Sequence, residues 1–297
     1  MKQIHTLLVF SLMILFGCSS DSNDVVESVN VTMAFSHYWE DVSVSNSDFN
    51  SFNYTNDHGE LLSVERLRYL ISDVEFSKSD GQTILLEGYN LVDVTNQTNL
   101  SYTPIEKIAK GTYSNVSFIF GLVNEKNTDG TYNDLNAASW NVPSMLGGGY
   151  HYMQLDGKFI NSNNDAQGYN YHAIRAADNA GANPTFPQDT FFRVDLGAIT
   201  IESDVEISIA MHIEEWFKNP NSWDLNVYNQ MLMPNSAENQ NHFKLYASCV
   251  PVKGVNRGAI FDLQRGNIHF VPNILLELLD KFSDRQLFEE YAEQKKM

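Results

Sequence analysis

Cysteine is scarce in this 297-residue chain, which contains only Cys18 and Cys249. Cys18 follows an apolar run at the N-terminus, where a cysteine indicates lipidation, as argued below. One cysteine then remains, so no disulfide can form within the folded part of the chain. The hydrophobic core alone must hold the fold, and a composition of 43% hydrophobic residues can supply a large core.

Positive charge is also sparse. The chain has 19 lysine and arginine residues against 37 aspartate and glutamate residues, which gives a formal net charge of −18. Nucleic acids and anionic lipid surfaces attract proteins through clusters of positive charge, so neither is expected as a partner. The negative charge would instead concentrate cations near the protein surface.

The sequence lacks the short motifs that mark common enzyme sites. No dinucleotide-binding or phosphate-loop glycine pattern follows a predicted strand. Neither the GxSxG nucleophile motif nor the HExxH metalloprotease motif is present. We therefore expect a binding protein and not an enzyme.

The longest apolar run lies at the N-terminus. Residues 1–17 combine Lys2 with the apolar stretch Leu7–Phe16, which is too short to cross a bilayer as a helix and is typical of a secretory signal. The run ends in LFGC, which resembles a bacterial lipobox and predicts a lipid on Cys18. Residues 18–28 read as a flexible tether, so we expect an extracytoplasmic protein anchored to a membrane. An ordinary signal peptide with an incidental cysteine is the alternative.

Short alternating segments predict a mainly β fold for residues 29–249. In Val29–Trp39 every second residue is apolar, which is the pattern of a strand with one buried face. Further short strands are expected at spacings punctuated by glycine, asparagine and aspartate, with a helix-like start at residues 60–68. This pattern is typical of an antiparallel β-sandwich with short helices.

Residues 250–297 have a different character and are interpreted as a C-terminal extension. Their first part, up to Val271, reads as irregular because glycine and basic residues interrupt it. From Pro272 to Lys296 apolar residues recur at helical spacing, which predicts an amphipathic C-terminal helix.

Four histidines are candidate metal ligands, because imidazole is the commonest protein ligand for copper and zinc. His151 and His172 lie on two short predicted strands that are neighbours in the sequence. His37 continues the apolar face of the first strand, so it must be partly buried and needs a partner. His212 lies opposite the apolar face of its strand and is a weaker candidate. Each of them could instead be a structural histidine.

Several segments, taken in order, resemble one family. The segments include FSHYW, GELLSVERLRYLISDVEF, GGGYHYMQLDGKF, YNYHAI and MHIEEWFKNPNSWDLN. They resemble the copper-binding proteins associated with methanobactin import, the MbnP-like family. The match covers roughly Val29–Asn239, and the tail from Val250 does not match.

The resemblance implies a secreted or outer-membrane-attached β-sandwich, on the cell surface or the periplasmic face, that binds one copper ion. The ion would be Cu⁺ or Cu²⁺, with zinc less favoured. By position, His37, His151 and His172 match the histidines of the family, so the resemblance implies that they converge on one ion.

Some members of this family carry a kynurenine that is made by oxidising a tryptophan, a reaction attributed to a di-haem peroxidase. Trp140 falls at the matching position, but the residues between Trp140 and Tyr150 depart from the spacing of the family. Trp39, two residues after His37, is the other candidate.

A second function remains open. A β-sandwich lipoprotein could bind carbohydrate or peptide on exposed aromatic side chains, with the histidines serving the structure. The aromatic candidates for such a surface are Trp140, Tyr150, Trp216 and Trp223.

Overall fold

The computed structural model describes residues 27–177, 181, 183–187, 189–218, 222–230, 249–253, 258–262 and 267–271. The predicted signal segment, nearly all of the tether and the predicted C-terminal helix lie outside these residues. Within the described part of the chain, no helix has the length and apolar character needed to span a membrane.

Strands make up most of the described chain, and the helices are short. The strands are β1 Ser28–Val29, β2 Val31–Trp39, β3 Val42–Ser43, β4 Tyr54–Thr55, β5 Leu61–Ser77, β6 Thr83–Asp93, β7 Ser101–Tyr102, β8 Ile108–Ala109, β9 Gly111–Phe120, β10 Met153–Ile160, β11 Ala166–Ala173, β12 Phe192–Ile201, β13 Val205–His212, β14 Cys249–Lys253, β15 Gly258–Asp262 and β16 Asn267–Val271. The helices are α1 Asn133–Ala137 and the 3-10 helices η1 Asn46–Asp48, η2 Ser144–Leu146 and η3 Ile213–Phe217.

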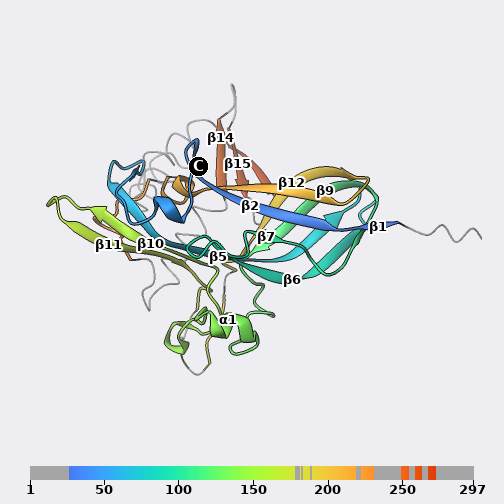
Figure 1. Cartoon of the computed structure of the whole chain (residues 1–297), viewed down its shortest axis with the longest axis horizontal. Helices are drawn as coiled ribbons and strands as arrows, with labels where there is room; N and C mark the ends of the chain where they lie inside the picture. The colour runs from blue at the N-terminus through green and yellow to red at the C-terminus, as the bar shows by residue number, and fades with distance from the viewer. Residues whose placement is uncertain are drawn as a thin grey trace, which may run out of the picture.

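Two main sheets form the sandwich (Figure 1). The large sheet has the order β11-β10-β5-β9-β12, and β4 and β6 also pair with β5. The small sheet has the order β13-β2-β3, and β7 also pairs with β2. Strand β2 pairs with β13 in parallel, whereas the other described pairs are antiparallel. The predicted mainly β, sandwich-like fold is confirmed.

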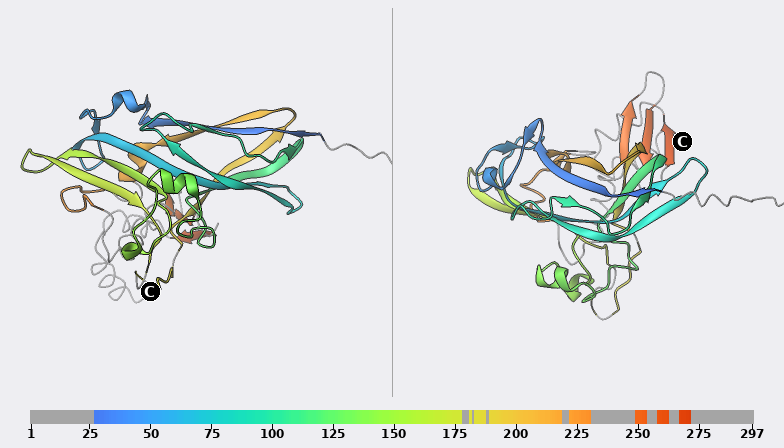
Figure 2. Two further views of the ribbon diagram at one scale, coloured as in Figure 1. Left: turned by 60° about the horizontal axis from the view of Figure 1, so that its bottom comes forward. Right: turned by 45° about the vertical axis from the view of Figure 1, so that its right-hand side comes forward.

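The two faces of the large sheet have different surroundings. Strand β2 lies over one face, which we call the inner face (Figure 1). Helix α1 and the loops next to it lie on the other side, which we call the outer face (Figures 1 and 2). This difference decides which histidines can meet.

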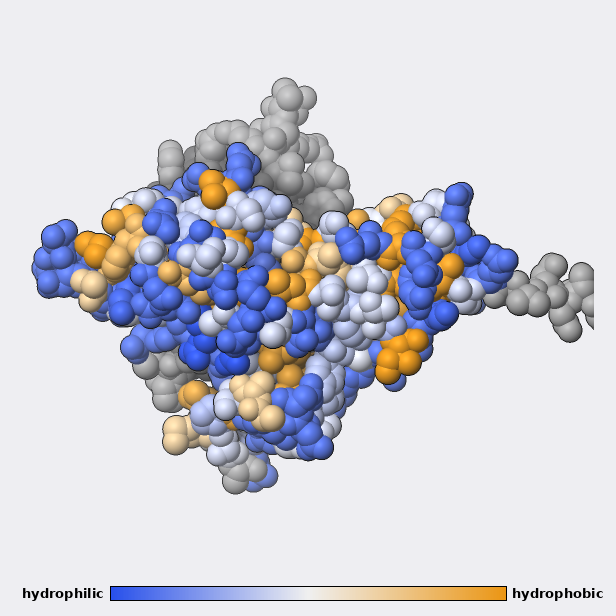
Figure 3. Space-filling view, viewed as in Figure 1, coloured by the Kyte–Doolittle hydropathy of each residue, from blue (hydrophilic) through white to orange (hydrophobic). Residues whose placement is uncertain are grey.

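The surface of the face shown in Figure 3 is mostly hydrophilic, with apolar side chains scattered between polar ones. This distribution agrees with the formal net charge of −18. Scattered apolar side chains are normal on soluble proteins and do not by themselves indicate a binding surface.

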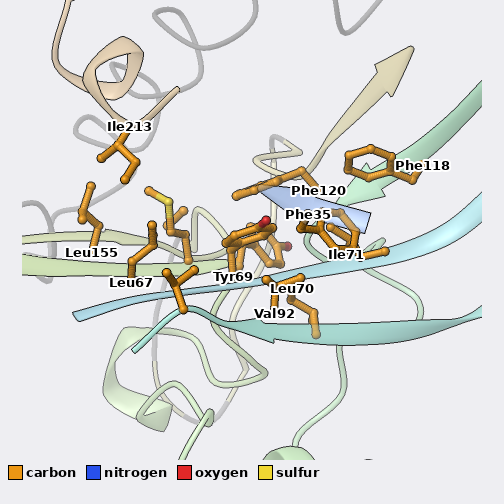
Figure 4. Packing of buried hydrophobic residues seen from close by; sticks show 14 of the residues in the cluster. Phe35, Leu67, Tyr69, Leu70, Ile71, Val92, Phe118, Phe120, Leu155 and Ile213 are labelled. Atoms are coloured by element: carbon orange, nitrogen blue, oxygen red, sulfur yellow. The ribbon is translucent and has the colours of Figure 1, made fainter. Parts of the chain in front are cut away.

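Aromatic side chains fill the space between the sheets (Figure 4). Phe35 from β2 meets Tyr69 from β5 edge to face at 6.0 Å between ring centroids, and Tyr69 stacks on Phe120 from β9 at 5.6 Å. Strand β2 buries every second residue, as its sequence predicts. Full burial of one such side chain contributes about 1.5–3 kcal/mol to stability, so this layer is a main source of the stability of the fold.

The helix-like start expected at residues 60–68 is wrong, because β5 is one 17-residue strand. This strand pairs with β10 and β9 and is buried on both faces along most of its length. A strand buried on both faces carries apolar residues without strict alternation, so its sequence can mimic helical spacing.

The segment from Val250 to Val271 is also more regular than its sequence indicates. Strands β14, β15 and β16 form a three-stranded antiparallel sheet. Each of these strands has five residues. So short a segment, interrupted by glycine, shows too few alternations for a periodic pattern to be recognised.

Candidate metal centre

His151 and His172 meet on the outer face of the large sheet. Their ring centroids lie 5.3 Å apart, and the rings are nearly perpendicular at 84°. His172 lies on β11 directly opposite Gln154 of β10. His151 lies just before β10, where its backbone N–H donates to the carbonyl of Trp140 at 3.0 Å. The histidine pair predicted from two neighbouring strands is therefore brought together.

The loop that carries Trp140 and His151 depends on its triple glycine. Gly147, Gly148 and Gly149 have φ angles of 107°, 66° and 82°, a region that residues with a Cβ rarely adopt. This reversal lets the backbone N–H of Val142 donate to the Gly149 carbonyl at 2.8 Å. The turn therefore places the histidine beside the tryptophan.

Each imidazole of the pair uses one ring nitrogen for a protein acceptor. His151 Nδ1 lies 3.0 Å from the Trp140 carbonyl oxygen, and His172 Nε2 lies 2.7 Å from Asp156 Oδ1. Carbonyl and carboxylate oxygens only accept, so these two nitrogens carry the protons. In the neutral rings, the lone pairs then remain on His151 Nε2 and His172 Nδ1. Protein metal ligands are typically oriented by such a bond from the other ring nitrogen.

Asp156 is held as a carboxylate by its neighbours. Asn170 Nδ2 donates to Oδ1 at 2.6 Å, and the Arg66 guanidinium forms an ion pair with Oδ2. Burial alone would raise the pKa of Asp156, but the hydrogen bonds from His172 and Asn170 and the charge of Arg66 lower it to about 2. Asp156 is therefore ionised at neutral pH and fixes the orientation of the His172 ring.

Burial keeps the His151 imidazole neutral. Its side chain is 7% exposed. Burial lowers the pKa of His151 to about 4, with smaller contributions in the same direction from His172, Arg66 and Arg68, and against an opposing hydrogen bond to Trp140. An imidazole binds a metal ion only in its neutral form. This environment therefore lets His151 bind a cation without competition from protons at neutral pH.

Trp140 forms a wall beside the pair. Its side chain is fully buried, and its ring centroid lies 5.6 Å from that of His151. The Arg68 guanidinium lies over the indole at 5.0 Å and donates to Gln154 Oε1 at 2.6 Å and to the Ala138 carbonyl at 3.2 Å. The indole Nε1 is buried and has no hydrogen-bond partner in the described part of the chain. Of the two tryptophans considered for oxidation, this one adjoins the histidine pair.

His37 is separated from the pair by the large sheet. Directly opposed residues on antiparallel strands share a face of the sheet. Tyr69 of β5 opposes Met153 of β10. One residue along, Arg68 of β5 opposes Gln154 of β10, which in turn opposes His172 of β11, so these three side chains share the other face. Tyr69 therefore points to the inner face and His172 to the outer face.

The partner of His37 lies on that inner face. His37 Nε2 is 3.0 Å from the Tyr69 hydroxyl, and the side chain is 4% exposed. Trp39 packs in the core against Tyr54 and Phe217, at 4.7 and 5.9 Å between ring centroids. The structure does not bring His37 together with His151 and His172, so the expected convergence of three imidazoles is not found.

His212 is also distant from the pair, because it lies on β13 in the small sheet. Its side chain is 44% exposed, and its ring stacks on Tyr38 at 5.6 Å. Its Nδ1 lies 3.3 Å from Glu214 Oε1. The outward direction expected from the strand pattern is observed.

Comparison with known proteins identifies the family. A family model described as MbnP matches residues 28–236, which is more than half of the chain. The chain belongs to the MbnP family. The matched residues include the histidine pair and Asp156, and the resemblance seen in the sequence is confirmed.

Among solved structures, MbnP from Methylosinus trichosporium is similar to this chain, with a TM-score of 0.45 and 12% sequence identity. The similarity covers 68% of this chain and 80% of that chain. The search of curated proteins returned no match.

The aromatic side chains proposed for a carbohydrate-binding surface are not exposed in this MbnP-family protein. Trp140 and Tyr150 are fully buried, and Trp223 is 7% exposed. Trp216 is half-buried and packs against the aromatic core. Stacking on a sugar ring needs an accessible aromatic face, so these four side chains do not provide the surface that this alternative requires.

A second group of donor side chains was not indicated by the sequence. His58, Glu60 and Asp224 place one donor atom each within 4.8 Å of one another. His58 and Glu60 are close in the sequence, but Asp224 is distant and only the fold brings it near. No local spacing could have identified this group.

Proposed function

We propose that this MbnP-family protein binds one copper ion through Nε2 of His151 and Nδ1 of His172. One observation carries the proposal: each ring donates from one nitrogen to a fixed oxygen, which leaves two lone pairs on adjacent rings. Family membership associates the chain with methanobactin and copper, which favours copper over zinc. The protein holds the ion and does not transform a substrate.

The charges around the pair favour the monovalent ion. Two neutral imidazoles contribute no charge, and Asp156 is already paired with Arg66. The Arg68 guanidinium lies against Trp140 on the same face. A second positive charge on the ion adds repulsion from these guanidinium groups, so Cu⁺ is held at a lower electrostatic cost than Cu²⁺.

Substitution of either histidine should abolish stoichiometric copper binding. We expect one copper ion per chain in the wild type, and an affinity weaker by about a hundredfold or more in His151→Ala and in His172→Ala, because each removes one of two protein ligands. Asp156→Asn should weaken binding by about tenfold to a hundredfold, since it disturbs only the orientation of His172. Competition with a chromogenic copper chelator measures these affinities.

His212→Ala is the matched control, because it removes an exposed histidine from the other sheet. It should retain the wild-type copper stoichiometry and affinity. Wild-type affinity in both His151→Ala and His172→Ala would disprove the site, whatever the effect of the control.

The same proposal places the protein outside the cytoplasm, anchored to the outer membrane by a lipid on Cys18. Cys18→Ser should move the protein from the membrane fraction to the soluble fraction without a change in copper stoichiometry, because Cys18 is not one of the proposed copper ligands. Cys249→Ser should change neither property. Membrane association of Cys18→Ser at the wild-type level would contradict the anchor.

A di-haem peroxidase as partner, and oxidation of Trp140, also belong to this proposal. The choice of Trp140 as the oxidised residue is supported by the 5.6 Å between its ring centroid and that of His151, whereas Trp39 packs in the core. Peptide mass spectrometry on protein from the native cell tests it. An unmodified Trp140 in copper-loaded protein would contradict the proposed oxidation.

A further inference from the structure

His58, Glu60 and Asp224 form a cluster at one end of the sandwich, away from the histidine pair. His58 Nδ1 lies 2.9 Å from Glu60 Oε1, and His58 Nε2 lies 3.8 Å from Asp224 Oδ2. The first two residues lie in the turn before β5, and the third lies in the loop after η3. His58 is 44% exposed and Asp224 is 35% exposed, so an ion can reach the cluster from solvent.

The two carboxylate oxygens of Glu60 have different surroundings. Its Oε1 accepts from the Leu225 backbone N–H and from Asn226 Nδ2, each at 3.1 Å, besides its contact with His58. Its Oε2 is buried, in a residue that is only 6% exposed, and has no hydrogen-bond partner among the described residues. A buried carboxylate oxygen without a donor is costly, and a bound cation would offset this cost.

The two segments are fixed independently of any ion. Asn56 Oδ1 accepts from the Glu60 backbone N–H at 2.9 Å, and Asn56 Nδ2 donates to the Trp223 carbonyl at 3.1 Å. The bond from Leu225 to Glu60 adds a second connection. The segments that carry the donor side chains are therefore preorganised, and binding would not have to order a loop.

The cluster carries more negative than positive charge. Among the described residues, neither Glu60 nor Asp224 forms an ion pair with a lysine or arginine, and His58 is the shared contact of both. Asp57 adds a further carboxylate next to the cluster, where it accepts from the Ser222 hydroxyl and interacts electrostatically with Lys218. A cation would offset this charge.

A second histidine–glutamate pair in the fold, His212 and Glu214, has an ion-paired lysine, which the first cluster lacks among the described residues. His212 is also 44% exposed and contacts Glu214, whose Oε2 is likewise buried without a hydrogen-bond partner. There, Lys218 Nζ lies 3.8 Å from the other oxygen, Glu214 Oε1, and supplies a positive charge to the pair. In the first cluster the third charged group is a carboxylate, Asp224, which lies beside His58 Nε2.

We propose that His58, Glu60 and Asp224 bind a divalent transition-metal cation of the zinc type, at a site separate from the copper pair. One imidazole nitrogen with two carboxylate oxygens is a donor set typical of zinc, whereas calcium and magnesium prefer oxygen alone. Bond lengths of about 2.0–2.2 Å place ligand atoms about 3.4 Å apart in a tetrahedral site. Small side-chain rotations bring donors that lie within 4.8 Å to this spacing.

Zinc titration by calorimetry tests the site without interference from the copper pair when the full chain carries His151→Ala and His172→Ala. This background should bind one zinc ion per chain. Adding His58→Ala or Asp224→Asn should weaken zinc binding by about a hundredfold or more, whereas adding His212→Ala should leave it unchanged. Asp224→Asn conserves the shape of a half-exposed side chain, so it addresses the site even if His58→Ala fails to fold.

The same substitutions in the otherwise wild-type chain should remove one bound zinc ion and leave copper stoichiometry intact. Absence of zinc binding in the background would overturn the proposal. Zinc binding that survives both His58→Ala and Asp224→Asn would overturn it as well. Neither result affects the copper site, which is tested by the copper titrations.

Discussion

Alanine at position 157 should prevent folding or lower the free energy of unfolding by more than about 4 kcal/mol. Gly157 lies on β10 where the register with β5 shifts, between Asp156 and Gly157. A Cβ at this position would lie 1.9 Å from the Ser63 carbonyl oxygen and 2.7 Å from the Tyr169 hydroxyl. The carbonyl belongs to the backbone of the central strand and cannot move without breaking the sheet, so Gly157→Ala forces β10 away from β5.

Gly168→Ala is the matched control, because Gly168 lies on β11, opposite Lys158 of β10, next to Gly157. A Cβ there would meet only the Gly157 carbonyl oxygen, at 3.9 Å, which is ordinary contact. We expect Gly168→Ala to stay within about 1 kcal/mol of the wild type by urea denaturation. A similarly small effect of Gly157→Ala would show that the two strands do not approach as closely as described.

Acid should destabilise the metal-free protein through His37. Burial lowers the pKa of His37 from 6.5 to about 4. Between these two pH values the unfolded chain binds a proton that the folded protein excludes, so the free energy of unfolding falls as the pH falls from 6.5 to about 4. The difference between the two pKa values corresponds to a loss of about 3 kcal/mol in the free energy of unfolding. This loss reaches its full value once His37 is protonated in both the folded and the unfolded state.

His37→Phe should remove this part of the pH dependence. The variant leaves the Tyr69 hydroxyl without its partner, which lowers stability by a constant amount and not in a pH-dependent way. His151 is also buried, and its lowered pKa of about 4 contributes in the same pH range, but it does so equally in both proteins. Urea denaturation between about pH 7 and about pH 4, in the presence of a chelator, should show the wild type losing about 3 kcal/mol more than the variant. Equal pH dependence in both proteins would mean that His37 titrates normally in the fold.

The sequence predicts the sandwich well where one face of a strand is buried. In β2 the alternation of Val31, Met33 and Phe35 matches the observed burial residue by residue. It predicts poorly where burial removes the alternation, as in β5, or where strands are too short to show a period, as in β14–β16. In both cases the prediction fails because the sequence shows no period-two alternation, and not because the residues are unusual.

The candidate site was predictable in part for a related reason. His151 and His172 come from neighbouring strands, so adjacency in the sequence implied adjacency in space. Whether His37 shares their face depends on the register across β5, β10 and β11. Tyr69, the partner of His37, and Arg68, which aligns with His172, are adjacent in β5 and therefore point to opposite faces. The acceptors at Trp140 and Asp156, which set the two free nitrogens, are likewise visible only in the fold.

The parallel pairing of β2 with β13 has a consequence for the order of folding. Ser36 on the first long strand contacts Ile209 on the other, 173 residues later in the chain. A chain that emerges with its N-terminus first makes β2 available long before its neighbour, and strands β5, β6, β9, β10 and β11 of the large sheet can assemble while β2 still lacks that edge. Contacts of such long range slow folding, so closure of the small sheet should come late. Until then, the apolar side of β2 depends on the already formed large sheet to shield it from other chains.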